Sequence, residues 1–263
     1  MSQRSAYDPG VPCWVDLSST DVDASARFYG EVFGWEADMI ADPAAGGYGM
    51  FRHQGKKVAG LGPVASPVAS PVASGERASV WNTFIATDDA AAVADKVRKA
   101  GGTVVMEPMA VFDQGTMTVF RAADGSYAGA WQAGGHHGAE LVNEPVSFCW
   151  NELITRDPAA AESFYPAVFG WTPNLLEMGG VKYTEWHAGE PAVGGMMEMF
   201  ADYPAETPSF WMTYFAVADL DATTDAAERA GGSVLVRGED APPGRFSMIA
   251  DPQGAGAVHH PAA

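Results

Sequence analysis

Hydrophobic and polar positions follow the same order four times along the chain. An alternating run typical of a β-strand leads each time to an Asp, and then to an Ala-rich stretch of about a dozen residues that ends at or near a Gly. The Asp residues are Asp21, Asp89, Asp157 and Asp219. An Asp carboxylate accepts the free N–H groups of a first helical turn, and Gly permits a left-handed exit. The pattern therefore predicts four helices, each preceded by a strand.

Short apolar runs separated by turn residues follow each predicted helix, as in "KYTEWHAGEPAVGGMMEM" after the third. The order strand, helix, strand, strand, strand thus occurs four times. It predicts an α+β fold in which each pair of such modules forms a curved mixed sheet with helices packed outside.

A longer internal repeat sets residues 13–35, "CWVDLSSTDVDASARFYGEVFGW", over residues 149–171, "CWNELITRDPAAAESFYPAVFGW", without a gap. Residues 80–102 align in the same way with residues 210–232. Self-similarity on this scale predicts duplicated domains. The repeated octet, "FYGEVFGW" and "FYPAVFGW", is interpreted as a packing device, because its apolar residues recur at helical spacing.

The repeat predicts tandem domains at residues 11–132 and 145–260, joined by a linker at 133–144. Within the first domain, "PVASPVASPVAS" (63–74) is too Pro-rich for a central strand, and we expect an extended connector there. His136 and His137 of the linker lack Cys or carboxylate neighbours at metal-ligand spacing, so they are a weak metal signal.

The charge balance limits the classes of partner that we expect the protein to bind. With 15 basic and 33 acidic residues among 263, the net charge is -18, which disfavours nucleic acid and an anionic membrane and would tolerate or attract a cationic ligand. Solubility alone is the simpler explanation of the charge. No stretch approaches the roughly 20 apolar residues of a membrane span, and "MSQRSAYDPG" lacks a signal-peptide core, so we expect a cytoplasmic protein. Cys13 and Cys149 occupy matching repeat positions and are interpreted as buried thiols.

Four such modules, an Asp followed by Phe-Tyr and Phe-Gly-Trp, and "DPQG" near the end resemble the vicinal oxygen chelate superfamily. This superfamily includes glyoxalase I, extradiol dioxygenases, fosfomycin-resistance enzymes and bleomycin-binding resistance proteins. The resemblance covers nearly the whole chain and is strongest to tandem two-domain actinobacterial members. It implies the fold more than the activity, because this fold hosts unrelated functions.

In the metalloenzymes of that superfamily, inward positions supply His or Glu ligands to one divalent metal. The resemblance places other residue types there: Trp14, Asn82 and Gly129 in the first domain, and Trp150, Met212 and Val258 in the second. The remaining ligand position offers only Glu198. Indole, glycine, valine and thioether groups do not hold a hard or borderline divalent cation, so we expect no metal and no cofactor. His259 would provide a ligand only in a shifted register.

Strand alternation predicts the lining of the two concave sheets. If Trp14 faces inward, so does Asp16, and Trp150 carries Glu152 with it. Further candidates for ligand binding are Trp81 or Asn82, Trp211 or Met212, Trp131, Trp186, and Met196 with Met197 and Met199. An aromatic, Met-lined cleft with a few carboxylates suits a bulky, partly planar ligand and is compatible with a cationic one. The alternative is that most of these tryptophans are core residues.

Three functions stay open. The first is metal-independent binding or sequestration of a small aromatic compound, as in antibiotic-resistance proteins, with the tandem domains acting as a pseudo-dimer that could dimerise further. The second is a metal-free isomerase, lyase or cyclase acting on a natural-product or keto-type substrate, with Asp16 or Glu152 as general base and His187, or Tyr48 with Tyr183, as acid. The third is a glyoxalase-like metalloenzyme with unusual ligands.

Overall fold

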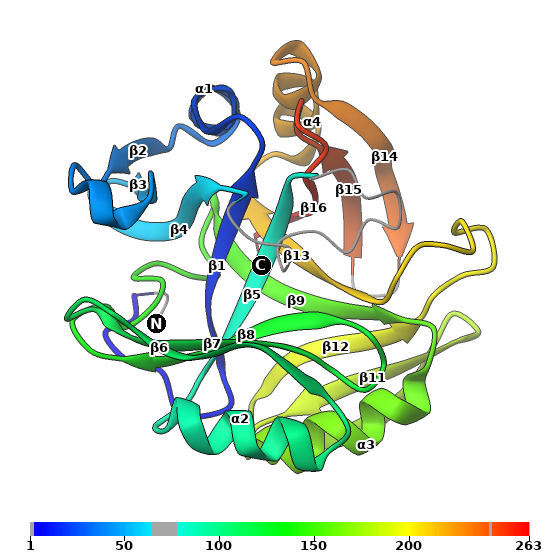
Figure 1. Cartoon of the computed structure of the whole chain (residues 1–263). Helices are drawn as coiled ribbons and strands as arrows, with labels where there is room; N and C mark the ends of the chain where they lie inside the picture. Colours follow the sequence, from blue (N-terminus) through cyan, green and yellow to red (C-terminus); the bar gives the residue numbers. More distant parts are fainter. Residues whose placement is uncertain (1–2, 65–77, 242–243, 263) are drawn as a thin grey trace.

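A computed structural model describes residues 3–64, 78–241 and 244–262 (Figure 1). Most of the predicted connector at 63–74 lies outside the described residues. None of the helices within the described ranges is long and apolar enough to span a membrane.

Four α-helices lie where the sequence pattern predicts them: α1 (Val22–Phe33), α2 (Ala90–Lys99), α3 (Pro158–Phe169) and α4 (Leu220–Arg229). Each begins after one of the four predicted Asp residues, whose carboxylate accepts a hydrogen bond from the backbone N–H three residues later. Gly34 and Gly170 end α1 and α3 in the left-handed conformation that Gly adopts at low cost. The Asp and Gly signals therefore fix these helices locally.

The first half of the chain forms an eight-stranded mixed sheet in the order β2-β3-β4-β1-β5-β8-β7-β6. Its strands are β1 (Pro12–Ser19), β2 (Glu36–Met39), β3 (Gly49–His53), β4 (Lys56–Pro63), β5 (Val80–Ala86), β6 (Thr103–Val111), β7 (Gly115–Arg121) and β8 (Tyr127–Ala133). Strand β1 pairs in parallel with β4 and antiparallel with β5, which joins the two modules of this half at the middle of the sheet.

The second half repeats this sheet in the order β10-β11-β12-β9-β13-β16-β15-β14. Its strands are β9 (Ser147–Thr155), β10 (Thr172–Met178), β11 (Val181–His187), β12 (Ala192–Glu198), β13 (Phe210–Val217), β14 (Ser233–Ala241), β15 (Gly244–Ala250) and β16 (Gly256–Pro261). The predicted α+β fold, with four strand-helix-strand-strand-strand modules in two mixed sheets, is confirmed.

The two halves share their cores. Helices α1 and α4 pack together at one end of the molecule, and α2 and α3 pack together at the other (Figure 1). The octet residue Phe33 lies 5.4 Å from Phe215 of the other half, measured between ring centroids. The indole N–H of Trp35 donates to the Val146 carbonyl, and that of Trp171 donates to the Gly10 carbonyl. The octet is therefore a packing device that also joins the halves, whereas the exact domain boundaries stay a prediction.

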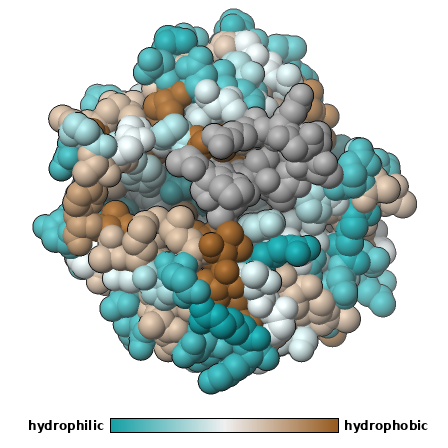
Figure 2. Space-filling view, in the orientation of Figure 1, coloured by the Kyte–Doolittle hydropathy of each residue, from teal (hydrophilic) through white to brown (hydrophobic). Residues whose placement is uncertain are grey.

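Hydrophilic and hydrophobic residues are mixed on one face of the molecule (Figure 2). The face seen in Figure 2 intersperses hydrophilic residues with smaller hydrophobic patches.

The two thiols are free: Cys13 is buried and Cys149 is half-buried. Burial raises the pKa of the Cys149 thiol to about 12, so it stays protonated and is a poor nucleophile.

Candidate ligand-binding site

Strand alternation divides each sheet into a face that packs against the helices and an opposite face, which we call the inner face. On β1, Val15 and Leu17 are fully buried in the helix-side core. Trp14 and Asp16 alternate with them and point to the inner face. In the second sheet, Leu153 of β9 lies in the helix-side core, so Glu152 points to the inner face.

On the first inner face, three side chains form a hydrogen-bonded chain. The Trp14 indole N–H donates to the Tyr48 hydroxyl at 3.1 Å, and this hydroxyl donates to the Asp16 carboxylate at 3.3 Å. Asn82 donates its amide N–H to the other Asp16 oxygen at 2.8 Å. Gly60 lies beneath Tyr48, where a Cβ atom would overlap the Tyr48 hydroxyl. The glycine therefore makes room for the tyrosine.

The second inner face repeats this arrangement with different partners. The Trp150 indole N–H donates to the Tyr183 hydroxyl at 3.2 Å, and the Tyr214 hydroxyl donates to the Glu152 carboxylate at 2.6 Å. Gly195 lies beneath Tyr183 as Gly60 lies beneath Tyr48. Both halves thus hold a Trp, a Tyr and a carboxyl group together over a glycine. We call these the first and second inner-face sites.

Glu152 is buried and Asp16 is half-buried, and neither carboxyl group has a cationic partner among the described residues. Burial raises the pKa of Asp16 to about 6, although the hydrogen bonds from Asn82 and Tyr48 oppose the change. Burial also raises the pKa of Glu152, against hydrogen bonds from Tyr214 and Tyr183. A carboxyl group that titrates near neutrality can give or take a proton, and it can also attract a cationic ligand group.

The two sites differ in how they are covered. The segment at 136–142 lies over the first: the His136 ring meets Trp14 edge-on, with 4.4 Å between centroids, and the Ala139 N–H donates to the Cys13 carbonyl. Trp14 is only 4% exposed, whereas its counterpart Trp150 is partly exposed.

Soft apolar side chains surround the second inner-face site. Buried residues form a small cluster of their own there: Ile154, Met199, Met212 and Val258. Partly buried side chains pack against it: Met197, Tyr203, Phe210, Tyr214, Phe246 and Met248. Thioether and aromatic side chains adapt to flat, polarizable ligands. The second site therefore offers the more accessible aromatic and Met-rich surface.

Four predicted ligand-binding residues lie on the wrong face for that role. Trp81, Trp186, Trp211 and Met196 are buried in the cores between sheets and helices. The Trp81 indole donates to Tyr29 of α1, and the Trp211 indole donates to Tyr165 of α3. Since Trp81 and Trp211 precede Asn82 and Met212 directly, alternation allows only one of each pair on the inner face, and the structure selects Asn82 and Met212.

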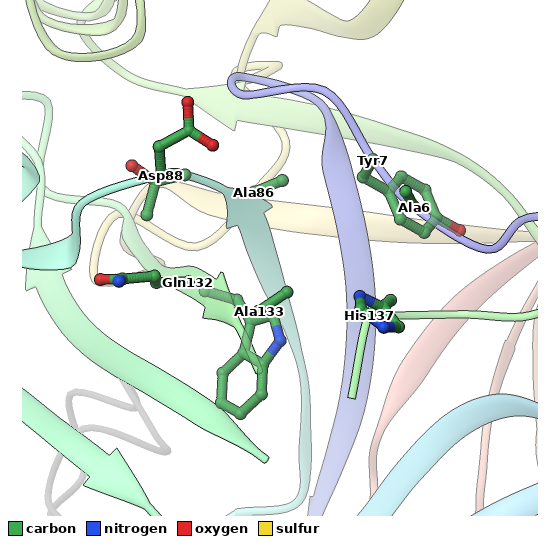
Figure 3. A pocket seen from close by; sticks show the side chains of 9 residues that line it. Ala6, Tyr7, Ala86, Asp88, Gln132, Ala133 and His137 are labelled. Atoms are coloured by element: carbon green, nitrogen blue, oxygen red, sulfur yellow. The ribbon is translucent and has the colours of Figure 1, made fainter. Parts of the chain in front are cut away.

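Trp131 lies apart from the Trp14 chain. Its indole N–H donates to the His136 carbonyl, and its ring lines a cavity of about 190 Å³. Figure 3 shows Tyr7 and His137 on one side of this cavity and Asp88 and Gln132 on the other. The His136 ring contacts both Trp131 and Trp14 and so connects Trp131 to the first inner-face site.

The residues predicted to act as acids differ in their positions. Tyr48 and Tyr183 do lie beside the carboxyl groups, whereas His187 bonds to the Glu185 carboxylate and the Glu190 carbonyl. Tyr214 was not predicted. The glycines beneath the tyrosines recur in "VAGLG" and "VGGMM", a repeated signal that could have indicated a close approach of side chains.

The residues at the superfamily's metal positions do not fit a metal ion. Asn82 donates its amide to Asp16, and the ring of Phe84 fills the space beside Gly129. His259, the shifted-register candidate, points into the helix-side core, 5.1 Å from Phe33 between ring centroids, where burial lowers its pKa to about 3. Glu198 is exposed. Among the side chains that the structure describes, no three His, Cys, Asp or Glu residues gather closely enough to share a metal. One carboxylate per site with Trp, Met and Tyr neighbours is a poor donor set for a divalent cation.

Comparisons with known proteins agree with this fold. The model of the Glyoxalase/Bleomycin resistance protein/Dioxygenase superfamily matches residues 13–127 and 137–256. "Putative glyoxylase CFP32" of Mycobacterium tuberculosis is 43% identical over 258 residues, covering 97% of this chain and 96% of that protein. "Anthracycline biosynthesis protein DnrV" of Streptomyces peucetius is 40% identical over 256 residues, covering 95% and 92%.

A solved structure adds fold similarity alone. The Mn(II)-bound glyoxalase from Novosphingobium aromaticivorans superposes with a TM-score of 0.66 at 16% identity, covering 97% of this chain and 82% of that one.

Proposed function

The chain belongs to the Glyoxalase/Bleomycin resistance protein/Dioxygenase superfamily, and from this premise we propose that it binds a small, planar aromatic compound at its inner-face sites without a metal ion. The observation that carries the proposal is the duplicated Trp-Tyr-carboxyl arrangement, which occupies the inner face of each sheet and, within the described part of the chain, has no metal donor set beside it.

The second inner-face site is the better candidate for the bound compound. Trp150 is partly exposed, and its hydrogen bond to Tyr183 fixes the plane of the indole against which a flat ring can stack. The surrounding Met and aromatic side chains supply apolar contact area. Glu152 adds one buried acceptor, which favours a ligand with a hydroxyl donor or a cationic group at that point.

The names of two relatives support this ligand class. Two proteins of 40% and 39% identity, each covering 95% of this chain, are named anthracycline biosynthesis proteins. Anthracyclines are planar, fused-ring aromatic compounds. We therefore place polycyclic aromatic compounds first among the ligands to test.

Calorimetric titration of the full chain with an anthracycline tests the proposal. We expect saturable binding that is unchanged after dialysis against a chelator. Trp150→Leu should weaken it by about 1 to 3 kcal/mol, because a buried aromatic contact is lost. Leu235→Ala removes an apolar side chain that is 58% exposed on edge strand β14, and serves as the matched control. Equal losses in both variants, or binding that needs an added divalent metal, would contradict the proposal.

A metal-free acid-base enzyme is the second candidate, favoured by the pKa of Asp16 near 6 and by the tyrosine hydroxyls beside both carboxyl groups. Chromatography coupled to mass spectrometry, which also resolves isomers of equal mass, separates the two functions in the incubated mixture. A ligand recovered unchanged supports binding alone. A product that disappears in Glu152→Gln or Asp16→Asn, with ligand affinity retained, would establish turnover by an isomerase, lyase or glyoxalase-like reaction.

A further inference from the structure

A second pocket lies outside the inner-face sites, and cations line it. Its volume is about 410 Å³, and it is lined by Gln3, Arg4, Ser5, Lys56, Lys57, Gly135, His137 and Glu140. Three of the 15 basic residues of the chain thus meet at one pocket of a protein with a net charge of -18. This local charge is opposite in sign to that of the whole molecule.

Three segments that are distant in the sequence build the pocket. The Arg4 backbone N–H donates to the Glu140 carbonyl at 3.1 Å, and Gln3 forms a β-bridge with Leu141. The Glu140 N–H donates to the Lys57 carbonyl at 2.8 Å. The amino-terminal segment, the start of β4 and the segment at 135–140 are therefore held together by their backbones, so the cations are gathered by structure rather than by chance exposure.

Among the residues that the structure describes, the cations at this pocket have no carboxylate partner. Arg4, Lys56 and Lys57 form no ion pair within residues 3–64, 78–241 and 244–262. By contrast, Arg98 and Arg237 each pair with two acidic side chains. Acidic residues outnumber basic ones by 33 to 15, so the absence of a partner here runs against the composition.

The one carboxylate that lines the pocket is already engaged. The Glu140 side chain accepts the Lys57 backbone N–H at 2.8 Å, which orients one of its oxygens toward the backbone. Burial is the main cause that lowers the pKa of the neighbouring His136, and electrostatic repulsion from Lys57 and His137 lowers this pKa further. The charge near the pocket therefore acts on this segment. The Arg4 guanidinium lies 6.0 Å from the centre of the Tyr7 ring, at the outer limit of a cation–π contact.

We propose that this pocket binds a small oxyanion, a phosphate or carboxylate group, held by Arg4, Lys56 and Lys57. Guanidinium and ammonium groups recognise such oxygens through charge-assisted hydrogen bonds. Repulsion from the acidic surface acts over longer distances and is screened beyond about 8 Å at physiological salt, so the nearby cations decide the interaction. The proposal is independent of the ligand at the inner-face sites.

Titration of the full chain with inorganic phosphate, and separately with acetate at matched ionic strength, tests the proposal. We expect saturable binding of one anion per chain. Lys56→Gln with Lys57→Gln should weaken it by about tenfold or more. Lys96→Gln with Lys99→Gln changes the net charge equally at exposed positions on α2, and should leave binding unchanged. Arg4→Gln should weaken binding in the same way, and it gives a second variant should the double substitution disturb the β3–β4 hairpin.

The outcomes are distinct. Binding of phosphate alone assigns the pocket to phosphate groups, and binding of acetate as well extends it to carboxylates. No saturable binding of either anion up to about 10 mM, or an equal loss in the α2 control, would overturn the proposal. Neither result depends on whether the inner-face sites bind an aromatic compound, which the anthracycline titration measures separately.

Discussion

Replacing Asp16 by Asn tests whether the first inner-face carboxyl is held in a desolvated environment. The native pKa of Asp16 is about 6, against 3.8 for the ordinary side chain. Because the native state binds this proton more tightly than the unfolded state, the wild-type protein should lose stability as the pH rises from about 4 to about 6. The difference of about 2 pKa units corresponds to a loss of about 3 kcal/mol.

Asn at this position keeps the shape of the side chain and never ionises. The stability of Asp16→Asn relative to wild type should therefore rise with pH. The isoelectric point is about 4.5, so the measurement is best made above it. Between about pH 5 and about pH 7.5, the linkage relation gives about 1.4 kcal/mol of the total change. An unpaired Asn N–H would add a penalty of about 1 to 3 kcal/mol, but this penalty does not vary with pH.

Urea unfolding followed by tryptophan fluorescence at several pH values measures this slope. Asp23→Asn, at an exposed position in the first turn of α1, removes the same charge and serves as the control. If the difference in free energy of unfolding between Asp16→Asn and wild type does not grow relative to that control, Asp16 has no raised pKa. The acid-base function suggested for it would then lose its basis.

Three further predictions concern packing and metal. Trp186→Ala should cost about 3 to 5 kcal/mol of stability in urea unfolding, because Trp186 is fully buried. Trp150→Ala should cost less stability and mainly lower ligand affinity, because Trp150 is partly exposed. The reverse order of the two stability losses would place the ligand site elsewhere. Gly195→Ala should displace Tyr183, break its hydrogen bond with Trp150 and lower the free energy of unfolding by about 1 to 3 kcal/mol. An unchanged unfolding curve would contradict the close approach of Tyr183 to Gly195. Dialysis against a chelator should leave thermal stability unchanged, and a lowered melting temperature would reveal a structural metal.

The inner-face sites could be predicted only in part. The alternation argument correctly paired Trp14 with Asp16 and Trp150 with Glu152, because residues two apart on a strand share a face. It could not tell which of two adjacent residues faces inward at Trp81 and Asn82, since a Trp side chain suits the helix-side core and a ligand cleft equally well. Tyr48, which directly precedes β3, contacts Asp16 of β1 across β4, and no local sequence pattern predicts a contact between these strands.

The sequence by itself determined the duplication, the four capped helices and the order of strands, because periodicity, Asp caps and Gly exits act within a few residues. Tertiary structure decided which aromatic residues are core and which line a site, because that depends on where the helices of both halves pack. It also decided the covering of Trp14 by the segment at 136–142 and the meeting of Arg4 with Lys56 and Lys57. Such contacts arise between segments far apart in the chain, so their physical cause is the packing of the whole molecule.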